Sequence, residues 1–223
     1  MDSSSSWQLA KDSLWPLLQG MVFGTIPLTA ISFALGLVVA LFLAIARMSK
    51  LWFLSAFAAA YISVIRGTPL LLQLFIIFYG LPSIGVVLDP WPSAILAFSL
   101  NVGGYAAETI RAAILSVPSG QWEAAATVGL GKSATLTRVV LPQAARVAVP
   151  PLSNTLISLV KDTSLASAVL VTEIFRKAQE LAAPTFQFFL MYGLAAAYYW
   201  VVSQTLTVIQ GRLERRLNRK VAK

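Results

Sequence analysis

A charge-free run fills residues 20–46, with the sequence GMVFGTIPLTAISFALGLVVALFLAIA. A hydrocarbon core about 30 Å thick is crossed by a helix of roughly 20 apolar residues, so this run predicts a transmembrane helix. The whole chain agrees, because 57% of its 223 residues are hydrophobic, only 12% are charged and its mean hydropathy is +0.75. We therefore expect an all-α integral membrane protein.

Four further apolar stretches follow the first one. Together they predict a bundle of five spans, within one membrane domain of residues 20–211, at residues 20–46, 52–81, 91–114, 144–162 and 186–210. Pro69 interrupts the second stretch, and a break or kink is expected there, because proline lacks an N–H and disfavours helix at the residue before it. The mixed segment 163–185 is too polar to span and predicts a broken helix with a loop.

The positions of the basic residues indicate an orientation. Lys and Arg outnumber the acidic residues 17 to 9 and gather mainly at the ends of apolar runs, which is typical of a topology signal rather than of nucleic-acid binding. This bias places the N-terminus outside the cell, and it places the loop 116–143 and the basic tail 212–223 in the cytoplasm. Residues 1–19 lack the basic start and the cleavage site of a signal peptide, so we expect this lead-in to be retained.

The cytoplasmic loop predicts two short helices and a turn. Residues 122–128 and 133–140 have helical composition, and the GLG between them supplies Gly129 and Gly131, which tolerate the positive φ of a tight turn. Two helices joined in this way would project from the membrane as a knob. The alternative is a plain solvated loop.

The composition excludes most enzymatic chemistry. The chain has no Cys and no His, which removes thiol catalysis, disulfides and the commonest transition-metal ligands, so we expect no metal site. It also lacks the GxxxxGK[ST] phosphate loop. We therefore expect a protein that is not an enzyme and holds no cofactor, and any use of ATP requires a separate partner.

Two predicted spans carry ionisable residues at similar depth. With a rise of about 1.5 Å per residue, the second span reaches Arg66, Gly67 and Thr68 roughly two-thirds of the way across, and the fourth reaches Lys161 at a comparable height, next to Asp162, Thr163 and Ser164. Broken helices and charges within a membrane usually face a cavity, so we interpret these residues as part of a solute site. The alternative is that Arg66 pairs with Asp162 structurally, or that both reach the outer headgroups.

The third span adds a polar face made of Asn101, Tyr105 and Glu108, which follow one another at i, i+4 and i+7. The glycine pair at 103–104 permits a neighbouring helix to approach closely. The face could line the solute site, or it could be a packing stripe with Glu108 beside Arg111 at the inner interface. An arginine for an α-carboxylate, an aspartate for an α-ammonium, and hydroxyl and amide groups for the remainder would suit a zwitterion.

The cytoplasmic loop resembles the EAA motif of the membrane subunits of bacterial ABC importers. This resemblance implies a role in docking an ATPase for Glu123, Ala124, Ala125, Gly129, Lys132, Leu141 and Pro142. The stretches RGTPLLLQLFIIFYG, YAAETIRAAI and PPLSNTLISLVKDTSL extend it over most of residues 20–210. The chain is thereby similar to the permeases of the polar amino acid ABC uptake family, and within that family to the L-cystine branch.

The resemblance implies a subunit of the bacterial inner membrane that works as two permease copies with two ATP-binding subunits and an extracytoplasmic solute-binding protein. ATP and Mg²⁺ would be bound by the ATPase. The family's substrate pocket would fall on Arg66, Thr68, the Asn101 face, and Asp162 with Ser164. L-cystine is the expected solute, and arginine, glutamine, histidine or an opine is the alternative.

Two functions of other classes fit parts of the chain. An ion-coupled secondary transporter also uses broken helices at mid-depth, but the EAA-like loop and the small number of spans argue against it. A membrane anchor that recruits an ATPase without transporting a solute would not need the polar lining.

Overall fold

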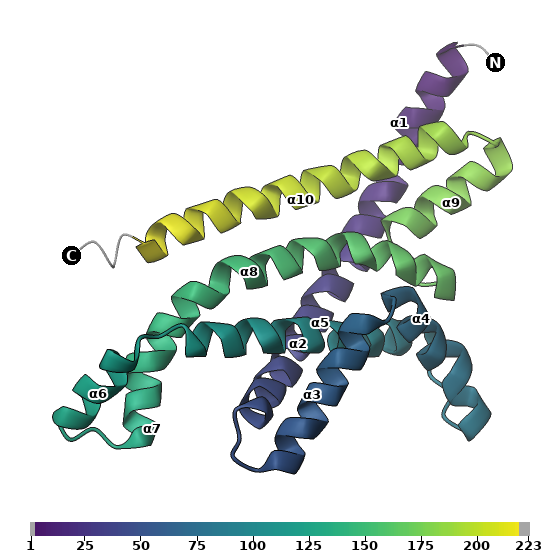
Figure 1. The fold of residues 1–223 in the computed structure, drawn as a ribbon. Coiled ribbons are helices and arrows are strands. Elements are labelled where there is room, and N and C mark those ends of the chain that lie inside the picture. The colour runs from purple at the N-terminus through teal and green to yellow at the C-terminus, as the bar shows by residue number, and fades with distance from the viewer. Residues whose placement is uncertain (1–2, 219–223) are drawn as a thin grey trace. The chain divides into compact units, whose positions relative to one another are not determined.

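The computed structural model describes residues 3–218, and within this range all regular secondary structure is helical. The α-helices are α1 (Ser3–Gly20), α2 (Ile26–Arg47), α3 (Trp52–Gly67), α4 (Leu70–Phe75), α5 (Pro90–Leu115), α6 (Ser119–Thr127), α7 (Lys132–Thr135), α8 (Leu141–Asp162), α9 (Ile174–Thr185) and α10 (Phe188–Asn218) (Figure 1). Three π-helical segments cover Met21–Thr25, Ile76–Gly80 and Leu136–Val140, and two 3-10 helices cover Leu81–Ile84 and Thr163–Val169. The prediction of an all-α fold is confirmed. The end of the predicted basic tail, 219–223, lies outside the described residues.

The chain forms two compact units, each built from separate stretches. Of the described residues, unit 1 holds the stretch up to Ala34 together with Pro69–Ser99 and Leu156–Thr207, and unit 2 holds Leu35–Thr68, Leu100–Thr155 and the stretch from Val208 onward. The predicted solute-site residues are therefore divided, because Arg66 and Tyr105 belong to unit 2 and Asp162 belongs to unit 1.

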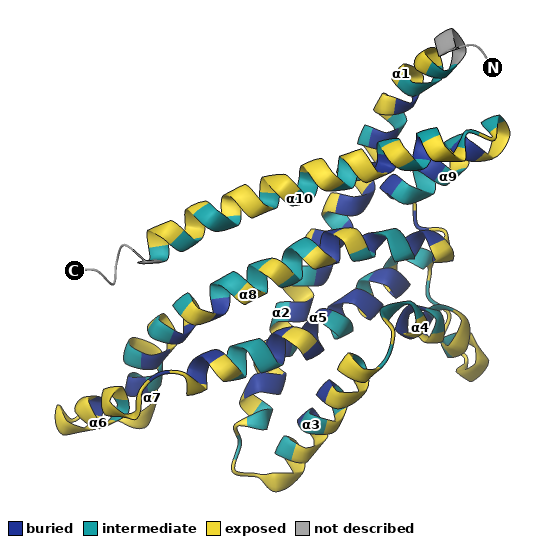
Figure 2. Cartoon of the chain, turned by 45° about the horizontal axis from the view of Figure 1, so that its top comes forward, coloured by how far each residue is buried: buried dark blue, intermediate teal, exposed yellow. Residues whose placement is uncertain are grey.

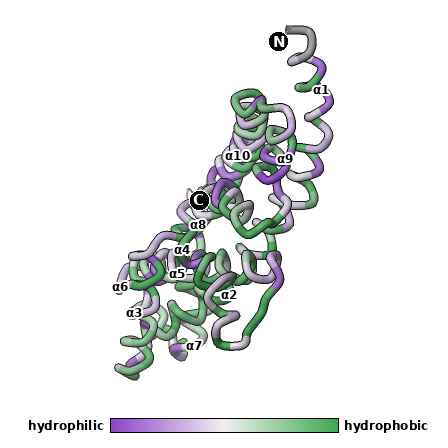
Figure 3. Tube along the Cα trace, turned by 90° about the vertical axis from the view of Figure 1, so that its right-hand side faces the viewer, coloured by the Kyte–Doolittle hydropathy of each residue, from purple (hydrophilic) through white to green (hydrophobic). Residues whose placement is uncertain are grey.

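The first helix is the clearest membrane span. Its continuous part from Ser6 to Arg47 has 42 residues, so the predicted lead-in is helical and runs directly into the first span. The hydropathy colouring in Figure 3 shows α2 as mostly apolar. Among the described residues this is the one unbent helix that is long and apolar enough to cross a membrane. The total rises to three when each of two bent pairs, Trp52–Gly67 with Leu70–Ile84 and Lys132–Val169 with Ile174–Thr185, counts as one span.

The break at Pro69 lies where the sequence predicts it. Helix α3 ends at Gly67 and α4 begins at Leu70. Thr68 has φ −123° and ψ 148°, the extended conformation that a residue before proline prefers because helical torsions would bring it against the proline ring. The helix therefore ends immediately after Arg66.

In unit 2, the glycine pair lets two helices lie against α5. A Cβ placed on Gly103 would be 2.5 Å from Cγ1 of Val39, and one on Gly104 would be 2.6 Å from Cγ2 of Ile65. Real Cβ contacts are longer than this, so larger residues would push the helices apart. The predicted close approach is confirmed.

In unit 1, two other glycines let the first helix pass across the start of α9. A Cβ on Gly20 would lie 2.9 Å from the carbonyl oxygen of Glu173, and one on Gly24 would lie 2.4 Å from the carbonyl oxygen of Thr172. An apolar cluster fixes this crossing, because Leu17 packs with Ile174 and other buried residues of α9 and α10. This crossing was not predicted.

The loop between α5 and α8 forms the knob that the sequence predicts, with one difference. Helix α6 and the following turn are present, but the expected second short helix is not separate, because α7 continues through the π-helical segment into α8. Of the two glycines in the turn, only Gly129 has a positive φ, of 79°, whereas Gly131 has φ −67°. In Figure 2 most of α6 is coloured as exposed.

Candidate functional site

The predicted solute-site residues Arg66 and Tyr105 meet in unit 2. The guanidinium carbon of Arg66 lies 5.6 Å from the centre of the Tyr105 ring, within the range of a cation–π interaction. Both side chains are exposed, and Tyr105 has 43% of its surface accessible. A guanidinium has five N–H donors, and a contact with an aromatic ring leaves it able to bind a carboxylate.

Other residues near the end of α3 have local contacts of their own. The hydroxyl of Tyr61 donates a hydrogen bond of 2.9 Å to the carbonyl of Leu100, which ties α3 to α5. The hydroxyl of Thr68 donates to the carbonyl of Val64 at 2.8 Å, so its donor is used locally. A Cβ on Gly67 would meet nothing within 4 Å, so close packing gives no reason for glycine there.

The other two residues of the α5 face have different surroundings. Asn101 is partly buried. The carboxylate of Glu108 is held by Arg111 one turn further along α5, with 2.6 Å between Oε1 and the Nη2 nitrogen of Arg111. This ion pair matches the alternative in which Glu108 has a structural role. A part in solute binding stays a prediction for both residues.

Asp162, Thr163 and Ser164 lie where α8 gives way to the 3-10 helix in unit 1. Thr163 is fully buried, and its hydroxyl donates to the carbonyl of Val160 at 2.7 Å. The hydroxyl of Ser164 donates to the carbonyl of Lys161 at 2.7 Å. Both hydroxyls therefore bind carbonyls at the end of α8, while Asp162 and Ser164 remain partly accessible.

Glu173 is a buried acid that was not predicted from the sequence. Its side chain is fully buried and caps α9, since its two oxygens accept the N–H groups of Phe175 at 2.8 Å and Arg176 at 2.7 Å. The hydroxyl of Tyr199 on α10 donates to the same carboxylate. The signal was weak, because glutamate is not among the favoured capping residues and the charges around it in sequence suggested an exposed loop.

The predicted docking residues form an exposed surface, with one exception. Glu123, Ala124, Gly129, Lys132, Leu141 and Pro142 are exposed, whereas Ala125 is buried. Ala125 is buried on α6, and Trp122 packs against a core at the end of α5 and the start of α8, which includes Ile114 and Ala144. The knob is therefore attached to two long helices through side-chain packing as well as through the chain.

The turn after α6 is a Schellman motif. The N–H of Leu130 donates to the carbonyl of Ala125 at 3.0 Å, and the N–H of Gly129 donates to the carbonyl of Ala126 at 3.0 Å. The motif requires a left-handed residue at the position of Gly129, where glycine has no Cβ penalty. The turn thus sets a defined angle between α6 and α7.

No group of three or more His, Cys, Asp and Glu side chains suited to a metal ion occurs within residues 3–218. The predicted solute-site residues instead carry the cation of Arg66, the carboxylates of Glu108 and Asp162, one amide and several hydroxyl groups. Their chemistry is that of binding a polar solute by hydrogen bonds and charge, and not of activating one.

Comparison with known proteins gives one family. Residues 32–219 match the model of the binding-protein-dependent transport system inner membrane component. The L-cystine transport system permease protein TcyB of Bacillus subtilis (strain 168) is 57% identical over 97% of this chain and 93% of its own length. The glutamine transport system permease protein GlnP of Escherichia coli (strain K12) is 35% identical, over 92% of this chain and 96% of its own.

A solved structure agrees with these relatives. The crystal structure of an amino acid ABC transporter with histidines contains a chain that superposes with a TM-score of 0.88 at 31% identity. The match covers 97% of this chain and 99% of that one. The likeness therefore extends over the whole fold and is not confined to the docking loop.

Proposed function

The chain belongs to the family of inner membrane components of binding-protein-dependent transport systems, and from this premise we propose that its solute is L-cystine. It is the permease subunit of an amino acid ABC importer in the bacterial inner membrane. It is not an enzyme, since ATP is hydrolysed by a separate ATP-binding subunit and a solute-binding protein completes the system. The observation that carries the choice of cystine is the similarity to an L-cystine permease over nearly the whole chain.

A second candidate is another polar amino acid. The similarity to a glutamine permease and to a transporter crystallised with histidines favours glutamine or histidine, and arginine or an opine belongs to the same chemical class. All of these carry an α-carboxylate and an α-ammonium, so the same charged residues could hold them. An ion-coupled secondary transporter is the more remote candidate.

The proposed topology has five spans with the N-terminus outside and the C-terminus inside. The helices that would cross are α2 with the π-helical segment before it, α3 with α4, α5, α8 and α10. The positive charges near the inner ends, among them Arg47, Lys50, Arg138 and Arg146, support this orientation, because cytoplasmic loops carry an excess of Lys and Arg. The same orientation puts the exposed face of α6 in the cytoplasm.

The proposed solute path uses the residues identified from the sequence. Arg66 would bind the α-carboxylate and Asp162 the α-ammonium, with hydroxyl and amide contacts from Thr68, Asn101 and Ser164. Support for the first role comes from the Arg66 guanidinium, which lies over Tyr105 and is paired with no carboxylate within residues 3–218. Alternating access would expose this path to either side of the membrane in turn.

ATP hydrolysis is proposed to be coupled to solute transport through the knob, which is formed by α6 and the turn after it. Two ATP-binding subunits would hold ATP and Mg²⁺, and their closure would move α6 by contact with Glu123, Ala124 and Lys132. The packing of Trp122 on the ends of α5 and α8 supports this route, because a displacement of α6 would be passed directly to both helices. A second copy of the same chain is proposed as the other permease, which gives one docking site for each ATPase.

The experiment is uptake by the reconstituted complex. Proteoliposomes containing the permease, its ATPase and its binding protein should accumulate radiolabelled L-cystine only when ATP is inside, and unlabelled L-cystine should compete better than arginine, glutamine or histidine. Preference for one of these competitors would replace cystine by the second candidate. Uptake by the permease alone down an ion gradient would contradict an ABC mechanism, and complete ATPase assembly without any uptake would indicate an anchor.

A further inference from the structure

The last turns of α10 carry a basic surface. From residue 212 onward the sequence RLERRLNRKVAK contains six basic residues and one acid. Three of the six, Arg212, Arg215 and Arg216, lie within the described residues, and all three are exposed. We name these three side chains the α10 basic surface. None of the ion pairs within residues 3–218 involves them, so no acid of the described chain neutralises their charge.

Helix α10 is longer than the hydrocarbon core of a membrane. Its 31 residues extend over about 46 Å at about 1.5 Å per residue, whereas the core is about 30 Å thick. A tilt of about 20°, the average for membrane helices, shortens this length by only a few ångströms. One end of α10 must therefore lie at or beyond the depth of the lipid headgroups, and the arginines identify the end at Asn218 as that part.

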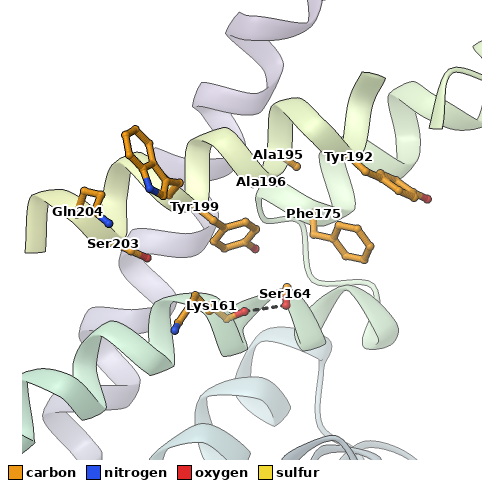
Figure 4. A pocket seen from close by; sticks show the side chains of 10 residues that line it. Lys161, Ser164, Phe175, Tyr192, Ala195, Ala196, Tyr199, Ser203 and Gln204 are labelled. Atoms are coloured by element: carbon orange, nitrogen blue, oxygen red, sulfur yellow. Dashed lines mark hydrogen bonds between the residues drawn. The ribbon is translucent and has the colours of Figure 1, made fainter. Parts of the chain in front are cut away.

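One face of α10 is directed toward α8. Figure 4 shows Tyr199 and Ser203 across a cavity from the end of α8. Further along, Nε2 of Gln210 donates to Oδ1 of Asn154 in α8 at 3.1 Å and to Oε1 of Glu214 at 2.9 Å. At about 100° per residue, the four α10 positions fall within about 60° of one another around the helix. The one acid of the segment from residue 212 onward therefore belongs to the face toward α8.

The α10 basic surface lies on the opposite face, in line with apolar side chains. Val208, Arg212 and Arg216 follow one another at i, i+4 and i+8, so they form one row along the helix, and Ile209 and Arg215 flank this row. Val208 and Ile209 are exposed, with 51% and 52% of their surface accessible. The face thus changes from exposed aliphatic residues to exposed arginines within one turn. This change matches the boundary between acyl chains and headgroups, and it places the arginines at the depth of the lipid phosphates.

We propose that the α10 basic surface binds the phosphate groups of anionic phospholipids in the cytoplasmic leaflet. Clusters of Lys and Arg directly after a membrane span are attracted to an anionic leaflet, and the planar guanidinium group matches a phosphate through two hydrogen bonds. The apolar row that leads into the surface favours lipid over an acidic protein surface, because acyl chains and headgroups would then cover one continuous face. The inference rests on the proposed topology for the choice of leaflet, and it does not depend on the solute.

The test uses the absence of cysteine from this chain. Leu213→Cys, at an exposed position beside the arginines, provides one site for a fluorophore on the permease, and the complex with the unsubstituted permease gives the background. In nanodiscs of phosphatidylcholine, quenching by phosphatidylglycerol with a nitroxide near its headgroup is compared with quenching by phosphatidylcholine that carries the same nitroxide. Phosphatidylglycerol should quench at least about twofold more strongly at equal mole fraction. The difference should shrink in about 1 M salt, where the screening length falls to about 3 Å.

Charge variants locate the contact. Combined Arg→Gln substitutions at all three positions of the α10 basic surface should make the two lipids quench equally, and the same three changes to Lys should keep most of the preference because the charge remains. Arg176→Gln with Lys177→Gln in α9 is the matched control, since both residues are paired with Glu180, and it should leave the preference unchanged. Loss of basic residues can alter the orientation of a span, so a membrane-impermeant maleimide is applied to cells that carry Leu213→Cys. It should react only after permeabilisation.

Several outcomes would overturn the inference. Equal quenching by the two lipids with all three arginines present would exclude a preference for anionic lipid, and this result needs no charge variant. A preference that persists in the Arg→Gln variant would place the lipid contact elsewhere. Equal quenching together with loss of the ATPase from the Arg→Gln variant in gel filtration would show that the surface binds protein instead. Reaction with the maleimide in intact cells would contradict the proposed topology, and with it the choice of the cytoplasmic leaflet.

Discussion

The guanidinium carbon of Arg66 lies 5.6 Å from the centre of the Tyr105 ring, which joins the end of α3 to the middle of α5. The helix break at Pro69 follows immediately, so Arg66 lies in the last turn of α3. A cation held over an aromatic face keeps its charge and its hydrogen-bond donors. This relationship is the physical basis for assigning Arg66 to the solute.

Replacement of Arg66 should therefore affect transport and not assembly. Arg66→Ala is expected to lower ATP-driven uptake by at least about tenfold, because a charge-assisted hydrogen bond to the solute is lost. Arg66→Lys should retain part of the activity, since the charge remains without the planar fork. Uptake in proteoliposomes measures the effect, and gel filtration of the complex serves as the control. Wild-type uptake in Arg66→Ala would rule out the assignment.

The turn after α6 should be sensitive to a Cβ at one glycine only. Gly129→Ala places a side chain at φ 79° and is expected to cost about 1 kcal/mol, which disturbs the angle of α6. Gly131→Ala is the matched control, because its φ is −67° and a Cβ there meets nothing within 4 Å. The ratio of ATP hydrolysed to solute transported should rise in the first variant and stay constant in the second. Equal ratios would argue against a mechanical role for the turn.

Charge reversal at Glu123 tests whether this residue contacts the ATPase. Glu123 is exposed on α6, so Glu123→Lys is not expected to affect folding. If Glu123 contacts the ATPase, charge reversal should uncouple hydrolysis from uptake and leave binding of L-cystine by the permease unchanged. Ala126, also exposed on α6, supplies a control in Ala126→Ser. Coupled transport in Glu123→Lys would exclude this residue from the docking contact.

The crossing of the first helix over the start of α9 should tolerate no side chain at Gly24. A Cβ there would lie 2.4 Å from a backbone oxygen, and backbone cannot move aside cheaply, so Gly24→Ala is expected to destabilise unit 1 by roughly 1–3 kcal/mol. Gly193→Ala in α10 meets nothing within 4 Å and should be neutral or stabilising, since alanine favours helix. Thermal unfolding of the purified complex would compare the two. The same midpoint for both variants would contradict the close crossing.

The buried cluster at Glu173 should behave as a coupled pair. Glu173→Ala removes a helix cap and leaves the hydroxyl of Tyr199 without its acceptor, for an expected loss of about 2–4 kcal/mol. Tyr199→Phe should cost less, about 1–3 kcal/mol, because the cap remains. In a double-mutant cycle the two losses should not add, since both variants remove the same hydrogen bond. Additive losses in unfolding measurements would show that the residues are independent.

Local features of the chain could be predicted from the sequence. The break at Pro69 follows from a missing N–H, the turn at Gly129 follows from the absence of a Cβ, and the close approach at Gly103 and Gly104 follows from their small size. One local feature was predicted wrongly. Because π-helical geometry carries no distinct sequence signal, α7 was expected to end before α8 and instead continues into it.

A helical membrane permease could be predicted from three features: the long apolar runs, the distribution of basic residues and the family motifs. Each of these features depends on residues that are close together in the sequence. The contacts that form the sites could not be predicted from the sequence in this way. Tyr199 and Glu173, or Arg66 and Tyr105, come from different helices, and their meeting depends on how those helices pack. Glu173 makes the difference clear, since its charge suggested an exposed loop, whereas two backbone N–H groups and a tyrosine hydroxyl compensate its burial.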